Sequence, residues 1–139
     1  SVIHYKYDAK NPDGVSNDVT LMGTNGLTPS YFIASEGTVS SFNVAYTLPV
    51  QDLWKLKAIK FYNDYSYFEK ERSDWSASQL NTTGMMLIAS PFLVWVDYTW
   101  GKNANFIGGS TNSTGYTSAS SQNSDKWLYR INLNLGFNF

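Results

Sequence analysis

The last fifteen residues, Asp125 to Phe139 ("DKWLYRINLNLGFNF"), alternate between apolar and polar side chains up to the final position. Only a β-strand places every second side chain on one face. The apolar face is about a dozen residues long, whereas a globular strand has about five or six and a tilted membrane strand about nine to eleven. This ending therefore predicts a strand that faces lipid, with a soluble β-sandwich strand as the alternative. The predicted lipid-facing residues are Trp127, Tyr129, Ile131, Leu133, Leu135, Phe137 and Phe139.

Composition narrows the classes of protein that this strand can belong to. No stretch approaches the roughly twenty apolar residues of a membrane helix, so a chain that spans a membrane does so as a closed barrel. The net charge is -1 and only 15% of the residues are charged, with no basic run, which argues against nucleic-acid binding. Aromatic residues make up 17% of the chain, and polar loop residues are frequent. We therefore expect an all-β, antiparallel, up-and-down transmembrane β-barrel, in a single domain that covers residues 1–139.

Five further segments have the alternation of a strand. In 78–89 the facing stays open, because a two-residue turn at Ser90 and Pro91 puts Met85 and Leu87 outward while a bulge reverses this. In 55–68, Asn63 interrupts the apolar face and suggests a bulge. The segment 19–36 reads either as one long loop or as a hairpin of two short strands. The alternating segments are 1–9, 37–48, 55–68, 78–89 and 91–102.

The connections between these segments differ in length. Those at 48–54 and 90–91 are short, whereas those at 69–77 and 103–125 are long. Outer-membrane barrels combine short periplasmic turns with long external loops, so this order favours a barrel over a sandwich.

The number of strands leaves two readings of the chain. Five strands and the opening segment make six, but a barrel with a filled interior needs about eight. Either 19–36 supplies a hairpin to a complete eight-stranded barrel, or the chain is the C-terminal part of a larger porin. We favour the second reading, because Gly and Pro interrupt 19–36. The absence of a signal peptide before the strand-like opening is also expected of a mature or truncated product.

The ending resembles the C-terminal signature of Gram-negative outer-membrane β-barrel proteins, in which apolar residues at alternate positions precede a terminal Phe. Leu133, Leu135, Phe137 and Phe139 carry the resemblance. It implies an outer-membrane location, with outer-membrane lipid, lipopolysaccharide and the barrel assembly machinery as partners. More loosely, "FYNDYS", "VDYTWGKN" and the ending are similar to the C-terminal parts of porins, including the phosphate-selective group. No concentrated Lys or Arg ladder occurs, so the resemblance does not carry phosphate selectivity.

A second set of residues lies opposite the apolar faces and is predicted to line a pore. In a wide barrel these side chains line an aqueous lumen, and in a small barrel they form a buried, paired network. Asp97 and Arg130 are expected at matching depth on adjacent strands, as an ion pair. Tyr62 and Trp95 either stack on a sugar or another ring, or only fill space. The predicted pore-lining residues are Lys60, Tyr62, Asp64, Trp95, Asp97, Arg130, Asn132 and Asn134.

Catalysis has little support in the sequence. His4 is the only histidine, no metal-ligand spacing surrounds it, and no nucleophile or acid is marked out as its partner. We expect no catalytic residue, metal or cofactor. The predicted function is a porin-type channel for passive diffusion of small hydrophilic solutes, with homo-oligomers allowed. The alternatives are a small non-conducting barrel that acts through its external loops, and a soluble secreted β-sandwich that binds carbohydrate.

Overall fold

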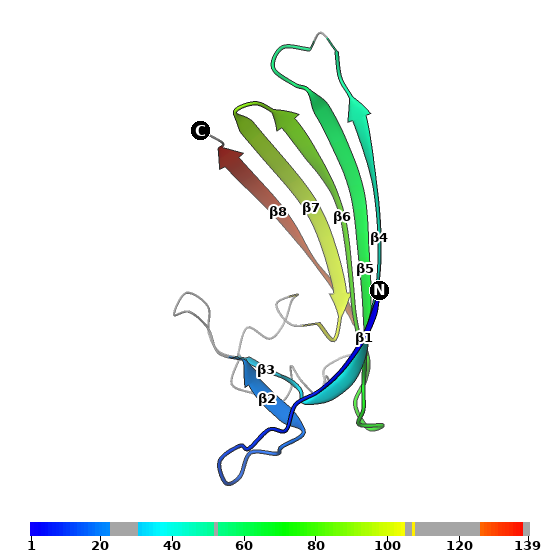
Figure 1. Ribbon diagram of the computed structural model, residues 1–139, viewed down its shortest axis with the longest axis vertical. Helices are drawn as coiled ribbons and strands as arrows, with labels where there is room; N and C mark the ends of the chain where they lie inside the picture. Colours follow the sequence, from blue (N-terminus) through cyan, green and yellow to red (C-terminus); the bar gives the residue numbers. More distant parts are fainter. Residues whose placement is uncertain (23–30, 52, 105–106, 108–125, 138–139) are drawn as a thin grey trace.

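The chain folds into antiparallel β-strands, and the described residues contain no helix (Figure 1). The computed structural model describes residues 1–22, 31–51, 53–104, 107 and 126–137. The predicted all-β, antiparallel fold is therefore confirmed, and no helix in these ranges is suited to crossing a membrane. The strands are β1 (Val2–Lys6), β2 (Val19–Met22), β3 (Tyr31–Ala34), β4 (Glu36–Pro49), β5 (Ala58–Lys70), β6 (Ser78–Ala89), β7 (Phe92–Lys102) and β8 (Trp127–Phe137).

Six of these strands form one open sheet in the order β1-β4-β5-β6-β7-β8. From β4 to β8 each strand pairs with the next one in the chain, as in an up-and-down barrel wall. Neither β1 nor β8 has a second strand partner in the described part of the chain, so no sheet closes into a barrel there. The β1 strand covers only the first part of β4, from Glu36 to Ser40.

The remaining two strands form a hairpin beside the lower end of this sheet (Figure 1). Of the two readings of 19–36, the hairpin is therefore correct. Within the described residues it forms a separate sheet and does not extend the main one. Val19 and Ala34 pair across the hairpin and are 0% and 2% exposed. The hairpin is joined to Ser35, whose amide donates to the Asp18 carbonyl oxygen at 2.7 Å.

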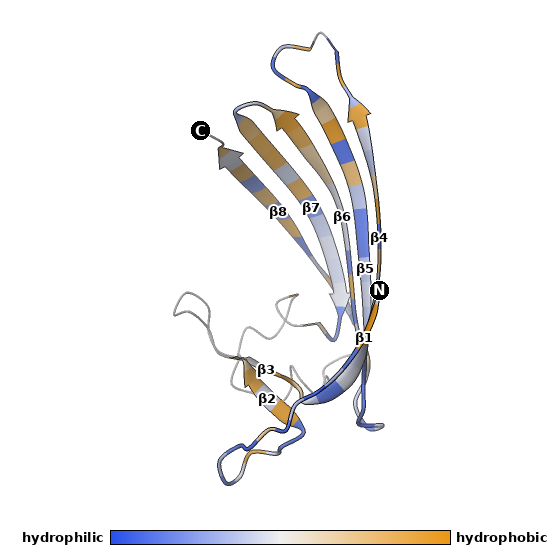
Figure 2. Ribbon diagram, in the orientation of Figure 1, coloured by the Kyte–Doolittle hydropathy of each residue, from blue (hydrophilic) through white to orange (hydrophobic). Residues whose placement is uncertain are grey.

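The register settles which residues share a face of the main sheet. Ala89 pairs with Phe92, so Leu87 lies on the same face as Val94. In segment 78–89, Met85 and Leu87 therefore lie on the same face as Val94 and Val96, as expected for a two-residue turn. We call this side the apolar face and the opposite side the polar face. Figure 2 shows the resulting alternation of hydrophobic and hydrophilic residues along β5.

The expected bulge at Asn63 is wrong. Pairing continues without interruption through Asn63, which lies opposite Val44 on β4 and Thr83 on β6. The amide is instead accommodated by hydrogen bonds, because Asn63 Nδ2 donates to Asn81 Oδ1 at 2.6 Å and to Thr83 Oγ1 at 2.8 Å. A polar cluster on the apolar face thus satisfies the side chain without disturbing the sheet.

The connection lengths follow the predicted order only in part. The β6–β7 link has two residues, Ser90 and Pro91, and β7 and β8 are separated by positions 103–126. The β4–β5 link at 50–57 has eight residues, however, and the β5–β6 link at 71–77 has seven. The prediction that 48–54 is the shorter of these two is wrong, because β5 begins later and ends later than the alternation indicated.

Candidate functional site on the polar face

All eight predicted pore-lining residues lie on the polar face, in three rows that run across the strands. Each row joins residues that the register places side by side. The first row is Lys60, Met86, Trp95 and Asn134. The second is Tyr62, Gly84, Asp97 and Asn132. The third is Asp64, Thr82, Thr99 and Arg130.

Tyr62 reaches across β6 to β7, where its hydroxyl donates a hydrogen bond to Asp97 Oδ1. This path exists because residue 84, between the two, is glycine. A Cβ atom at Gly84 would overlap the Tyr62 ring and would lie 2.6 Å from Asp97 Oδ1. The tyrosine ring therefore covers the backbone of Gly84, a contribution of this glycine that sequence reasoning missed.

Trp95 makes a similar contact with β8. A Cβ atom at Gly136 would lie 2.8 Å from Trp95 Cζ3, so the indole covers that glycine. Phe68 covers Gly37 in the same way near the other end of the polar face. Glycines in strands are unusual, and here they coincide with large rings on the neighbouring strand. A glycine at a polar-face position, next to a strand with aromatic residues, was the signal available in the sequence.

A cavity of about 350 Å³ lies on this face. Four predicted residues line it together: Lys60, Tyr62, Asp64 and Trp95. The remaining lining residues, which were not predicted, are Asn43, Val44, Ala45 and Met86. The other four predicted residues come from β7 and β8 and do not line this cavity. The site thus combines one cation, one carboxylate and two aromatic rings.

Asp97 and Arg130 lie on adjacent strands, as predicted, but not directly opposite one another. Asp97 lies opposite Asn132, and Arg130 lies opposite Thr99. The two charged residues are therefore diagonal neighbours, two positions apart in register along β8, and Asp97 also accepts a hydrogen bond from Tyr62. Long side chains reach a diagonal neighbour on the adjacent strand, so the ion pair between Asp97 and Arg130 stays a prediction.

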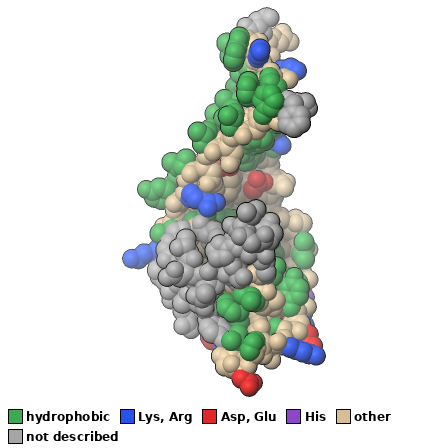
Figure 3. All heavy atoms as spheres, turned by 90° about the vertical axis from the view of Figure 1, so that its left-hand side faces the viewer, with side chains coloured by type: hydrophobic (Ala, Val, Ile, Leu, Met, Phe, Trp, Pro, Cys, Tyr) green, Lys and Arg blue, Asp and Glu red, His purple; other side chains and the backbone are tan. Residues whose placement is uncertain are grey.

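Figure 3 views the molecule from the left-hand side of Figure 1. Over the upper part of the sheet, hydrophobic side chains are interspersed with basic and acidic ones.

The predicted lipid-facing residues lie on the apolar face and are exposed. On β8 the exposed fraction ranges from 48% at Trp127 to 73% at Leu133. Phe139 lies outside the described residues. Aromatic pairs occur at both ends of β7 and β8: Tyr98 stacks on Tyr129 with centroids 5.7 Å apart, and Phe92 meets Phe137 edge-on at 5.4 Å.

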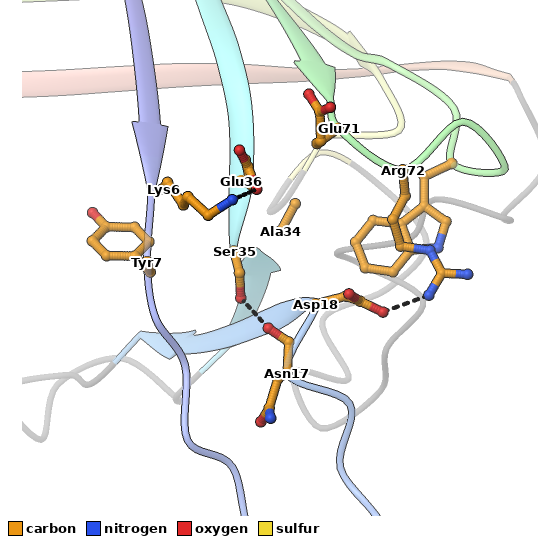
Figure 4. A pocket seen from close by; sticks show the side chains of 10 residues that line it. Lys6, Tyr7, Asn17, Asp18, Ala34, Ser35, Glu36, Glu71 and Arg72 are labelled. Atoms are coloured by element: carbon orange, nitrogen blue, oxygen red, sulfur yellow. Dashed lines mark hydrogen bonds and ion pairs between the residues drawn. The ribbon is translucent and has the colours of Figure 1, made fainter.

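A second cavity, of about 210 Å³, lies where the hairpin meets the β5–β6 connection (Figure 4). Arg72 contacts Asp18 Oδ2 at 2.5 Å and Asp74 Oδ2 at 2.8 Å, and lies over the Trp75 ring. Hydrogen bonds from Ser16 and Arg72 lower the pKa of Asp18. Bonding with Arg72 likewise lowers the pKa of Asp74, while both carboxylates raise the pKa of Arg72. Because 54 positions separate Arg72 from Asp18, no local pattern indicated this contact.

His4 lies on β1, where its Nδ1 is 3.1 Å from Thr38 Oγ1 and its Nε2 is 3.7 Å from a Glu36 oxygen. The described residues contain no group of three His, Cys, Asp or Glu side chains that would hold a metal ion. The expectation of no catalytic activity stays a prediction.

Comparison of the chain with protein-family models, with curated proteins and with solved structures gave no match. Functional inference therefore starts from the two faces of the sheet.

Proposed function

We propose that this protein is part or all of an outer-membrane β-barrel that acts as a porin-type channel for passive diffusion of small hydrophilic solutes. The observation that carries the proposal is the contrast between the two faces of one sheet. Large apolar side chains are exposed on one face, while charged and amide side chains gather on the other. A barrel wall in a membrane needs this division, with apolar residues toward lipid and polar residues toward the lumen.

The exposed apolar face is the first support. Soluble monomers rarely expose contiguous apolar patches larger than a few hundred Å². On β8, Ile131, Leu133 and Leu135 are 66%, 73% and 71% exposed, and the apolar residues of β4 continue the surface. Lipid chains cover such a surface without leaving a polar group unsatisfied.

The length of β8 is the second support. From Trp127 to Phe137 there are ten steps, which span about 34 Å at ~3.4 Å per residue. At a tilt of ~45° this span crosses about 24 Å, close to the ~25 Å apolar band of outer-membrane barrels. The aromatic pairs at its two ends then lie where the two interfacial girdles are expected.

Further strands must complete a closed wall. Since β8 and β1 run in opposite directions, an even number of antiparallel strands fits between them. The open edges support the reading that this chain is the C-terminal part of a larger porin. Outer-membrane lipid, lipopolysaccharide and the barrel assembly machinery belong to the proposal as partners, with Phe139 in the assembly signal.

Reconstitution tests the channel directly. The protein is refolded in detergent and added to planar bilayers. Beforehand, a change in its gel migration on boiling shows that it has folded into a detergent-resistant barrel. Discrete conductance steps are expected. If the protein is heat-modifiable but never conducts, the proposed channel function is contradicted, while the proposed barrel fold is not. A protein that stays monomeric and soluble without detergent contradicts both.

A small non-conducting barrel is the second candidate. Tyr62 and Trp95 cover the polar face and Tyr62 bonds across β6, as expected of a filled interior. A soluble sandwich has less support, since the second sheet in the described residues is one short hairpin and leaves the apolar face exposed.

A further inference from the structure

We infer that the polar-face cavity beside Tyr62 and Trp95 binds a neutral sugar in its pyranose ring form, which makes sugars the solute class of the channel. This inference deepens the proposed function and rests on it, because the cavity faces the proposed lumen. Binding itself requires only the cavity.

The two aromatic rings are already held in place. The Tyr62 ring passes over Gly84 and is fixed at its far end by the hydrogen bond to Asp97. The Trp95 indole rests over Gly136. One side of each ring is therefore against the backbone, and both side chains line the cavity. Rings that are fixed before a ligand arrives lose little conformational entropy on binding.

A pyranose matches this arrangement chemically. Its C–H groups form an apolar surface that packs on an aromatic ring, while its hydroxyl groups both donate and accept hydrogen bonds. Lys60 supplies donors, Asp64 supplies acceptors, and Asn43 supplies both, all from the rim of the same cavity. A volume of about 350 Å³ lies at the small end of the range for small-molecule sites.

The charges argue against an anionic solute such as phosphate. Lys60 and Asp64 both line the cavity and carry opposite charges, while the Asp97 carboxylate accepts the hydrogen bond of the Tyr62 hydroxyl. An anionic or a cationic solute therefore meets one side chain of like charge in this lining, whereas a neutral ligand uses both side chains as hydrogen-bond partners.

The test is a titration of the full chain, refolded in detergent micelles, followed by isothermal calorimetry and tryptophan fluorescence. Glucose and maltose are the probes. Mannitol, an open-chain polyol that has hydroxyl groups but no ring, is the control for the ring, and benzyl alcohol tests an aromatic ligand. We expect saturable binding of the two sugars and none of mannitol. Equal binding of mannitol, binding of benzyl alcohol alone, or no binding overturns the inference.

Variants locate the binding site. Trp95→Leu keeps an apolar side chain without the ring and is expected to weaken sugar binding at least tenfold. Trp127→Leu makes the same change on the apolar face and is expected to leave binding unchanged. If Trp95→Leu does not refold, Asp64→Asn replaces it, with an expected loss of at least threefold. Equal losses in the variant and the Trp127→Leu control overturn the inference.

Failure of this inference is distinguishable from failure of the channel. If the protein conducts but shows no saturable sugar binding, the sugar site is overturned and the channel proposal stands. Sugar binding without conductance supports the site and overturns the channel.

Discussion

At the scale of single residues, side chains on the polar face are held by contacts that cross the strands. The hydroxyl of Tyr62 reaches Asp97 only because Gly84 lies between them. Arg72 holds the start of the hairpin near the end of β5 through Asp18. Each contact joins segments that are far apart in the sequence. A substitution at one residue of each contact therefore tests it.

Gly84→Ala is expected to destabilise the protein by about 1–3 kcal/mol, since the new methyl group overlaps the Tyr62 ring. Unfolding in urea after refolding into lipid vesicles measures the change. The control is the Tyr62→Ala background, in which the ring is absent. In that background, Gly84→Ala is expected to lower the free energy of unfolding much less. If the losses from the two substitutions are additive, the contact between Gly84 and the Tyr62 ring is contradicted.

Arg72→Gln is expected to raise the pKa of Asp18 toward its ordinary value, leaving it below that value because the Ser16 hydrogen bond remains. A carboxyl whose folded pKa is lowered contributes stability above its unfolded pKa, and this is lost as the pH falls through the folded pKa. The variant should therefore lose less stability on acidification. Carboxyl carbon NMR titration measures the pKa, and an unchanged Asp18 value contradicts the contact.

At the scale of elements, the β8 strand separates two environments along a single backbone. Leu133 lies on the apolar face and is 73% exposed, while the next residue, Asn134, lies opposite Trp95 on the polar face. If lipid covers one face and water the other, neighbouring residues respond differently to the same substitution.

Leu133→Arg is expected to destabilise the protein in vesicles by about 2–4 kcal/mol, the cost of a cation near the middle of the bilayer. Asn134→Arg, one position away, should cost far less because its side chain faces water. Urea unfolding of both variants measures the difference. Equal costs contradict the assignment of the two faces to lipid and water.

At the scale of the whole molecule, the open sheet and the separate hairpin raise the question of what encloses the polar face. A closed, water-filled barrel exposes that face to small solutes, whereas a filled barrel does not. The chain contains no cysteine, so single cysteines report this access without background.

In vesicles, the thiol of an Asn132→Cys variant is expected to react with a small, charged thiol reagent at least tenfold faster than the thiol of an Ile131→Cys variant. Ile131 is the neighbouring residue on the apolar face. Mass spectrometry follows the labelling. Slow reaction at both positions supports the non-conducting barrel, and fast reaction at both contradicts a lipid-covered face.

The sequence by itself determined most of the long strands and the alternation of their side chains, whereas it left the facing of 78–89 and the structure of 19–36 open. Ser78–Ala89 was predicted with the bounds that the structure has, and the polar-face residues from Lys60 to Asn134 were assigned to the correct side. The period of two is a local property of the extended backbone, so each strand carries it in its own residues. The tertiary structure decided the partners: Asn132 rather than Arg130 opposite Asp97, Gly84 beneath Tyr62, and Arg72 beside Asp18. These depend on strand register and on how far a side chain reaches across a neighbouring strand, and residues on different strands set both.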